Sequence, residues 1–191
     1  SSTSRGLGDV YKRQVLHEVV KFYSDWIIED PRDGTLISVP STSPENLFIN
    51  DKGTPVASCL GSAMDQQVIS EVFDNYIETC EILQLESSFL EKIKKQRKQL
   101  RPGFVLGITG RILEWDREYV EREPGHRHMS HLYGFHPGND VSIDKNPKIF
   151  NAVKETLDYR LANGGAGTGW SRAWLITVSY THLTLPTNRE V

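Results

Sequence analysis

The sequence predicts a mainly α-helical protein whose long irregular loops carry the functional residues. Apolar residues recur at three-to-four spacing in five segments of the 191-residue chain, which is the period of a helix with one buried face. Two stretches between them, about residues 32–63 and 101–144, show no sustained period and are rich in Gly, Pro, Ser, Asn and Asp. Loops of such length are often functional. Helices joined in this way suggest an all-α barrel or toroid with its chemistry at one rim.

Capping and breaking residues mark the ends of these helices. Pro31 and Gly34 end the first helix, Ser62 suits the N-cap of the second, and Pro147 suits the first turn of the fourth. The expected helices span residues 15–30, 62–83, 87–100 and 147–161, with a fifth opening near residue 169, and the expected short strands span 36–39, 55–60 and 104–108.

The two ends of the chain are expected to be non-native tails. Residues 1–14 and 179–191 have no helical or strand periodicity that joins their neighbours, and both resemble translated adapter sequences. Segments of that origin are not part of a native fold. The expected organisation is therefore one portion of a helical domain over residues 15–178, a fragment of a longer protein.

Composition excludes several classes of partner. A net charge of −3 argues against nucleic acid, and the Lys-rich segment 92–98 is better explained as a solvated helix face. The sequence has no 18-residue apolar run, so no membrane span is expected. Cys59 and Cys80 lack metal-ligand spacing, and the sequence leaves open whether they pair.

The segment Pro40–Asn46 places one carboxylate, Glu45, in a rigid non-helical turn. Prolines at both ends of the Ser-Thr-Ser run restrict the backbone, and the hydroxyls can lock the loop. A general acid must be held still, so Glu45 is a candidate for proton transfer. The alternative is an ordinary exposed turn.

Three histidines, His126, His128 and His131, lie in an HxHxxH pattern that would suffice for a catalytic zinc ion. The sequence has no HExxH motif, and Arg127 adds a positive charge where a cation would bind. Arg and His side chains are good donors to sugar hydroxyls. The favoured interpretation is a substrate-orienting or structural cluster, with no metal and no cofactor.

Two aromatic positions suggest a sugar platform. Trp170 follows a Gly-Thr-Gly turn that would deliver it to a concave surface, and Trp115 lies between Glu114 and Asp116. The alternatives are a simple tight turn at Trp170 and a core anchor at Trp115. A GxSxG elbow is missing from the sequence, so acyl hydrolysis is not supported.

Taken together, these motifs resemble the catalytic domain of glycoside hydrolase family 95, the inverting α-L-fucosidases that act on α-1,2-linked fucose. Five motifs occur in the same order and spacing: 41–46, 64–67, 112–115, 126–138 and 169–174. The resemblance implies an (α/α)6 barrel of which this chain supplies the middle helices. It also implies a fucosylated oligosaccharide or glycan as the substrate.

The resemblance assigns roles by motif. Glu45 matches the general acid, and Arg127 and His128 match the pair that contacts the fucosyl unit. The other matching positions are implied to bind substrate: His131, Glu114, Trp115 and Trp170. The family's Asn-x-Asn motif and the Asp that activates water are absent from this sequence, so the fragment alone is expected to be inactive.

An inverting glycosidase needs an acid and a water-activating base on opposite faces of the sugar, and the acid's pKa is expected to be raised by partial burial. Three other interpretations remain open from the sequence. They are an α-L-galactosidase of the same family, a metal-dependent hydrolase using the His cluster, and a non-catalytic helical carbohydrate-binding or scaffold module.

Overall fold

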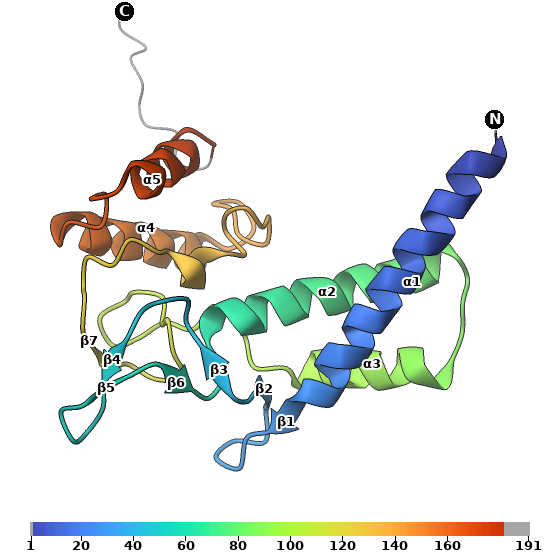
Figure 1. Cartoon of the computed structure of the whole chain (residues 1–191), viewed down its shortest axis with the longest axis horizontal. Coiled ribbons are helices and arrows are strands. Elements are labelled where there is room, and N and C mark those ends of the chain that lie inside the picture. The colour runs from blue at the N-terminus through green and yellow to red at the C-terminus, as the bar shows by residue number, and fades with distance from the viewer. Residues whose placement is uncertain (1, 182–191) are drawn as a thin grey trace, which may run out of the picture.

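The computed structural model describes residues 2–181, and the chain is mainly helical over this range (Figure 1). Ser62 caps the second helix as expected, and Ser87 caps the third, because each hydroxyl accepts a hydrogen bond from the backbone N–H three residues later. The helices are α1 (Ser2–Trp26), α2 (Ala63–Ile82), α3 (Ser88–Gln99), α4 (Pro147–Ala162) and α5 (Gly169–Thr181), with a 3-10 turn η1 (Ser130–Leu132).

Short antiparallel strand pairs organise the stretch between α1 and α2, which the sequence predicts to be largely irregular. β1 (Ile27–Glu29) pairs with β2 (Leu36–Ser38), and β3 (Ser41–Thr42) pairs with β6 (Ser58–Cys59). β4 (Phe48–Ile49) lies between β5 (Pro55–Val56) and β7 (Val120–Glu121). The Glu45 turn therefore lies between two strands, β3 and β4, that are each fixed by a partner distant in sequence.

Two local predictions are wrong. The first helix ends at Trp26 and not at Asp30, because residues 27–29 leave the helix to pair with β2; the same helix also begins at Ser2, well before residue 15. The expected strand at 104–108 is reduced to one isolated bridge between Leu106 and Ile112. Of the two expected tails, residues 182–191 lie outside the described part of the chain.

Two hydrophobic clusters lie on either side of the strand region. α1, α2 and α3 pack around Val20, Ile69, Phe73 and Ile93. A second cluster joins α4 and α5 to the η1 segment, with these members fully buried: Leu132, Phe135, Val153 and Val178. Cys59 and Cys80 are both buried and free, so they do not pair.

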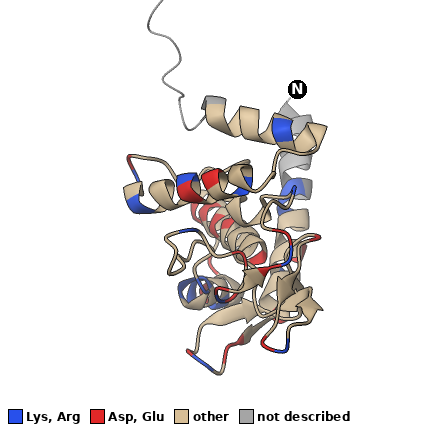
Figure 2. Ribbon diagram, turned by 90° about the vertical axis from the view of Figure 1, so that its left-hand side faces the viewer, with Lys and Arg blue, Asp and Glu red and all other residues tan. Residues whose placement is uncertain are grey.

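Basic and acidic residues are interspersed along the loops and helices (Figure 2). Basic side chains of α3 form ion pairs with acidic residues of α1 and α2, which fits a solvated helix face. These pairs are Lys92–Asp25, Lys94–Glu81 and Arg97–Asp74. No helix in residues 2–181 has both the length and the apolar character that a membrane crossing requires.

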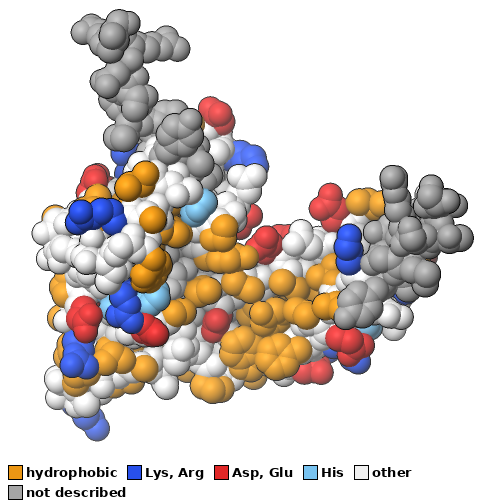
Figure 3. Space-filling model, turned by 45° about the horizontal axis from the view of Figure 1, so that its top comes forward, with side chains coloured by type: hydrophobic (Ala, Val, Ile, Leu, Met, Phe, Trp, Pro, Cys, Tyr) orange, Lys and Arg blue, Asp and Glu red, His pale blue; other side chains and the backbone are white. Residues whose placement is uncertain are grey.

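Large apolar side chains are exposed along α1 and α5, the first and last helices of the described chain. Phe22 on α1 is 61% exposed and Ile176 on α5 is 63% exposed. Figure 3 shows hydrophobic side chains spread over the hollowed face between the N-terminal and C-terminal helices. Such area is normally covered in a stable protein.

Candidate active site

The Glu45 turn has a strained backbone. The N–H of Asn46 donates to the carbonyl of Ser43 at 3.3 Å, and Pro44 fixes the second turn position. Glu45 occupies the third position with φ 58°, in the left-handed region that a type II turn reserves for glycine. A side chain there costs about 1–2 kcal/mol. Such strain persists only where the surroundings enforce it, and it concentrates at functional sites.

The carboxylate of Glu114 holds both ends of this turn. Ser43 Oγ donates to Glu114 Oε1 at 2.5 Å, and Asn46 Nδ2 donates to Glu114 Oε2 at 2.9 Å. All three side chains are buried. The strained residue is thus flanked on each side by a hydrogen bond to the same buried group.

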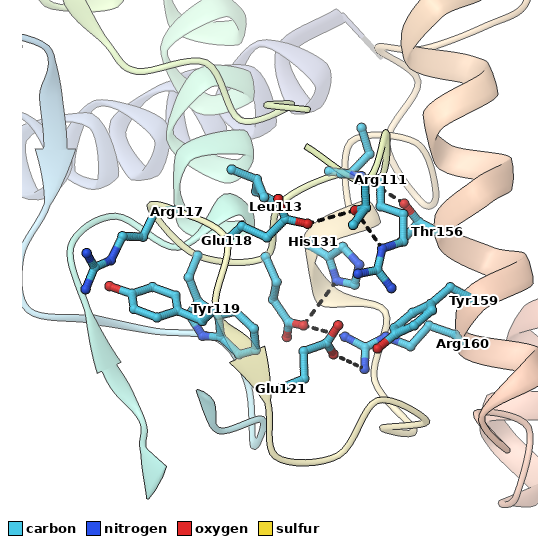
Figure 4. A pocket seen from close by; sticks show the side chains of 14 residues that line it. Arg111, Leu113, Arg117, Glu118, Tyr119, Glu121, His131, Thr156, Tyr159 and Arg160 are labelled. Carbon is cyan, nitrogen blue, oxygen red and sulfur yellow. Dashed lines mark hydrogen bonds and ion pairs between the residues drawn. The ribbon is translucent and has the colours of Figure 1, made fainter. Parts of the chain in front are cut away.

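Arg160 of α4 supplies the counter-charge to Glu114. Figure 4 shows the guanidinium group of Arg160 beside Glu121. Its Nη2 lies 2.5 Å from Glu114 Oε2, and its Nη1 lies 2.7 Å from Glu121 Oε2. Burial raises the pKa of Glu114, but the charge of Arg160 and the hydrogen bonds from Ser43 and Asn46 outweigh burial, and the net pKa is lowered. Glu114 is therefore an ionised group inside the protein.

His131 lies beside this pair, with Nδ1 3.8 Å from Glu114 Oε2. Its ring is completely buried, and burial lowers the pKa of His131 to about 4. The imidazole is therefore neutral near pH 7. Its Nδ1 makes no hydrogen bond among the described residues, and it faces a cavity of about 30 Å³ that Arg160, Trp115 and Glu121 also line.

Above this buried layer, Glu45 meets Arg127 and His128. Arg127 Nη2 and His128 Nε2 both contact Glu45 Oε2, the latter at 2.9 Å. The ring of His128 lies 4.8 Å from the ring of Trp170, which is half exposed. These four side chains form a surface cluster that we call the rim cluster: Glu45, Arg127, His128 and Trp170.

The expectation of a raised pKa at Glu45 is wrong for this structure. The hydrogen bond with His128, followed by the charge of Arg127, lowers the pKa of Glu45, and the carboxylate is 60% exposed. The described residues do not bury Glu45, so burial does not raise its pKa enough to offset these two effects. Glu45 is ionised here.

The beginning of α2 fixes the loops on both sides of the site. Ser41 Oγ donates to Asp65 at 2.6 Å and accepts from the N–H of Ser62, which anchors the strand before the turn. The amide of Gln67 donates to the carbonyls of Gly103 and His131 and accepts from the N–H of Gly134. The first turns of α2 therefore position both the Glu45 turn and the loop that contains His131.

The predicted site residues divide into two layers. The structure brings Glu45, Arg127, His128 and Trp170 together at the surface, and it places His131, Glu114 and Trp115 beneath them. Trp115 is 5% exposed and packs against Phe48, which matches its alternative interpretation as a core anchor. Sequence reasoning missed Arg160 entirely. Its signal was an arginine that continues the inward helix positions 150, 153 and 157 of α4.

The described residues do not form the histidine metal site that the sequence leaves open as an alternative. No group of three His, Cys, Asp or Glu side chains within residues 2–181 is arranged to hold a metal ion. His126 and His131 are buried, whereas His128 is directed to Glu45.

Comparison with known proteins finds one family and several relatives. The model described as glycosyl hydrolase family 95 catalytic domain matches residues 8–184. "Alpha-L-fucosidase 2" of Arabidopsis thaliana is 35% identical over 161 residues, which is 84% of this chain and 18% of that protein. "Probable alpha-fucosidase A" of Aspergillus niger is 31% identical over 84% of this chain and 20% of its own length. The Aspergillus oryzae protein of the same description is 30% identical over 78% of this chain and 21% of its own length. The chain therefore spans about a fifth of these relatives.

Proposed function

Because this chain belongs to the glycosyl hydrolase family 95 catalytic domain, we propose that it carries the acid half of an α-L-fucosidase active site, with Glu45 as the proton donor. The observation that carries the proposal is the placement of Glu45. It projects from a strained, doubly anchored turn directly onto Arg127 and His128. A carboxyl group held beside hydrogen-bond donors is suited to protonate a glycosidic oxygen.

Arg127 and His128 are proposed to bind the sugar, with Trp170 as an aromatic platform beside them. In the free protein these two donors engage Glu45 and hold its pKa low. A sugar hydroxyl that accepts the donors in place of the carboxylate weakens this effect. Sugar binding then raises the pKa of Glu45, so that the acid carries its proton when the substrate is in place.

The leaving oxygen takes its proton from Glu45, while water attacks the anomeric carbon from the opposite face. The water-activating Asn and Asp motifs of the resemblance are not in this sequence. We therefore assign this chain the acid and sugar-orienting groups only, and expect turnover from the full-length protein. The proposed substrate is a terminal α-1,2-linked L-fucose on a glycan, cleaved with inversion; an L-galactoside is the runner-up.

We also propose that the helices form part of an (α/α)6 barrel. The exposed apolar side chains of α1 and α5, among them Phe22 and Ile176, support this because further barrel helices would cover such faces. This arrangement would place the rim cluster at one end of the barrel.

The test is ¹H NMR of the reaction catalysed by the full-length protein that carries this sequence. With a fucosyl-α-1,2-galactoside, we expect L-fucose whose first-formed anomer is β, opposite to the substrate. Release of the α-anomer first, or preferential cleavage of the matched L-galactoside, would contradict inversion or the sugar assignment respectively.

A further inference from the structure

We infer that the buried Glu114–Arg160 pair is a positioning element that sets Glu45 relative to Arg127 and His128, and that Glu114 does not contact the sugar. The inference rests on the proposed function of Glu45. It replaces the substrate-binding role that the motif resemblance implies for Glu114 with a role exerted through the Glu45 turn.

Both oxygens of Glu114 are already engaged by protein groups. Ser43 binds Oε1, whereas Asn46 and Arg160 bind Oε2, and the side chain is only 3% exposed. A sugar hydroxyl would have to displace one of these donors and reach below the surface. The carboxylate instead fixes the separation between Ser43 and Asn46, the two residues that flank Pro44 and Glu45.

Arg160 extends the same control to the other half of the rim cluster. Its Nη1 donates to the backbone carbonyls of Glu123 and Pro124, both at 3.1 Å. These residues begin the loop that carries Arg127 and His128. The next residue, Gly125, packs so closely on the end of α4 that an added Cβ would lie 1.8 Å from the carbonyl oxygen of Asn163. The Glu114–Arg160 pair therefore fixes both the Glu45 turn and the loop that carries Arg127 and His128 relative to α4.

The first experiment measures kcat and KM of full-length variants on two substrates. One is a fucosyl-α-1,2-galactoside, whose leaving group needs protonation, and the other is an aryl fucoside with an activated leaving group. The variants are Glu114→Gln and Ser43→Ala, with Glu45→Gln as the benchmark and Glu118→Gln, a surface carboxylate, as the matched control. Glu114→Gln leaves Arg160 with Glu121 alone as a carboxylate partner and lowers stability, so Ser43→Ala serves where that variant does not fold.

Misplacement of the acid predicts that kcat on the galactoside falls on the order of 100-fold in Glu114→Gln and about tenfold in Ser43→Ala, with the aryl fucoside nearly unaffected. A rise in KM on both substrates would overturn the inference in favour of a sugar contact. Equal loss of kcat on both, in proportion to the folded fraction, would overturn it in favour of a purely structural role.

The second experiment is a ¹³C NMR titration of Glu45 in the purified chain, which does not depend on catalysis. In Glu114→Gln and Ser43→Ala, the pKa of Glu45 is expected to rise toward its ordinary value, because the carboxylate is no longer held against His128 and Arg127. An unchanged pKa would overturn the inference. If the pKa moves but Glu45→Gln loses both substrates equally, the positioning role stands and the proposed acid function fails.

Discussion

The Nε2 of His128 and the Oε2 of Glu45 lie 2.9 Å apart, although 83 residues separate them in the sequence. The group proposed to protonate the substrate is thus paired with a group proposed to bind it. This contact lowers the pKa of Glu45, and under the proposed function it ties the protonation of Glu45 to the binding of the sugar. It is also accessible to direct measurement.

Replacing His128 by Ala should raise the pKa of Glu45, because the hydrogen bond with His128 is the largest cause of its lowering and the charge of Arg127 is the next. Arg127→Gln should raise the pKa by less. The measurement is a ¹³C titration of the Glu45 carboxyl group. Glu118, whose pKa is lowered by Thr109 instead, is an internal reference that should not move. A shift of Glu118 equal to that of Glu45 would contradict a local effect.

Glu45→Gly should make the chain more stable than Glu45→Ala. Both variants remove the carboxylate, but only glycine adopts φ 58° without a steric penalty. The expected difference in the free energy of unfolding is roughly 0.5–1 kcal/mol after the greater flexibility of unfolded glycine is allowed for. Urea titration of both variants measures it.

Gln84 provides a matched control for this strain argument. It is the other non-glycine residue with a positive φ, 53°, in the described part of the chain, and it follows α2 far from the rim cluster. Gln84→Gly should stabilise the chain relative to Gln84→Ala by a similar amount. Equal stabilities within both pairs of variants would show that neither position is strained.

His131 should make the protein less stable as pH falls from 7 to 5. Its pKa is about 4 when folded and 6.5 when exposed, so below pH 6.5 the unfolded chain binds a proton that the folded chain refuses. The free energy of unfolding should fall by about 2 kcal/mol over this range. Urea titrations at both pH values measure the fall, which His131→Gln should largely remove. An equal fall in that variant would assign the effect to other groups.

Arg160 and Glu114 should show strong energetic coupling. Arg160→Met alone leaves buried carboxylates uncompensated and should destabilise the chain by about 3–5 kcal/mol. Glu114→Gln alone should also destabilise it, because Arg160 then lacks its closest counter-charge. The double variant should lose clearly less than the sum of the single variants. Additive losses would contradict a direct interaction between the two side chains.

The helices could be predicted because their information is local. The cap at Ser62 and the apolar period predict α2 and α3 almost to the residue. The end of α1 could not be predicted, because residues 27–29 have an apolar pattern that also suits a helix. Only pairing with β2, at residues 36–38, decides between the two.

The site was predictable only where residue type implies chemistry. Glu45, Arg127 and His128 stand out as a carboxylate and two donors, and the fold brings them together. Glu114 and Arg160 could not be recognised as a pair, because 46 residues separate them and their burial depends on the packing of α4. A buried charged residue is identified by the partners that surround it in the structure, and sequence patterns do not reveal those partners.

The most direct test of Glu45 as the acid is the kcat of full-length Glu45→Gln on the two leaving groups. We expect turnover of the fucosyl-α-1,2-galactoside to fall on the order of 100- to 10,000-fold, while an aryl fucoside with an activated leaving group keeps most of its rate. The amide cannot donate the proton, and only the first substrate needs it. Near-normal turnover of the galactoside, or equal losses on both substrates, would contradict the assignment.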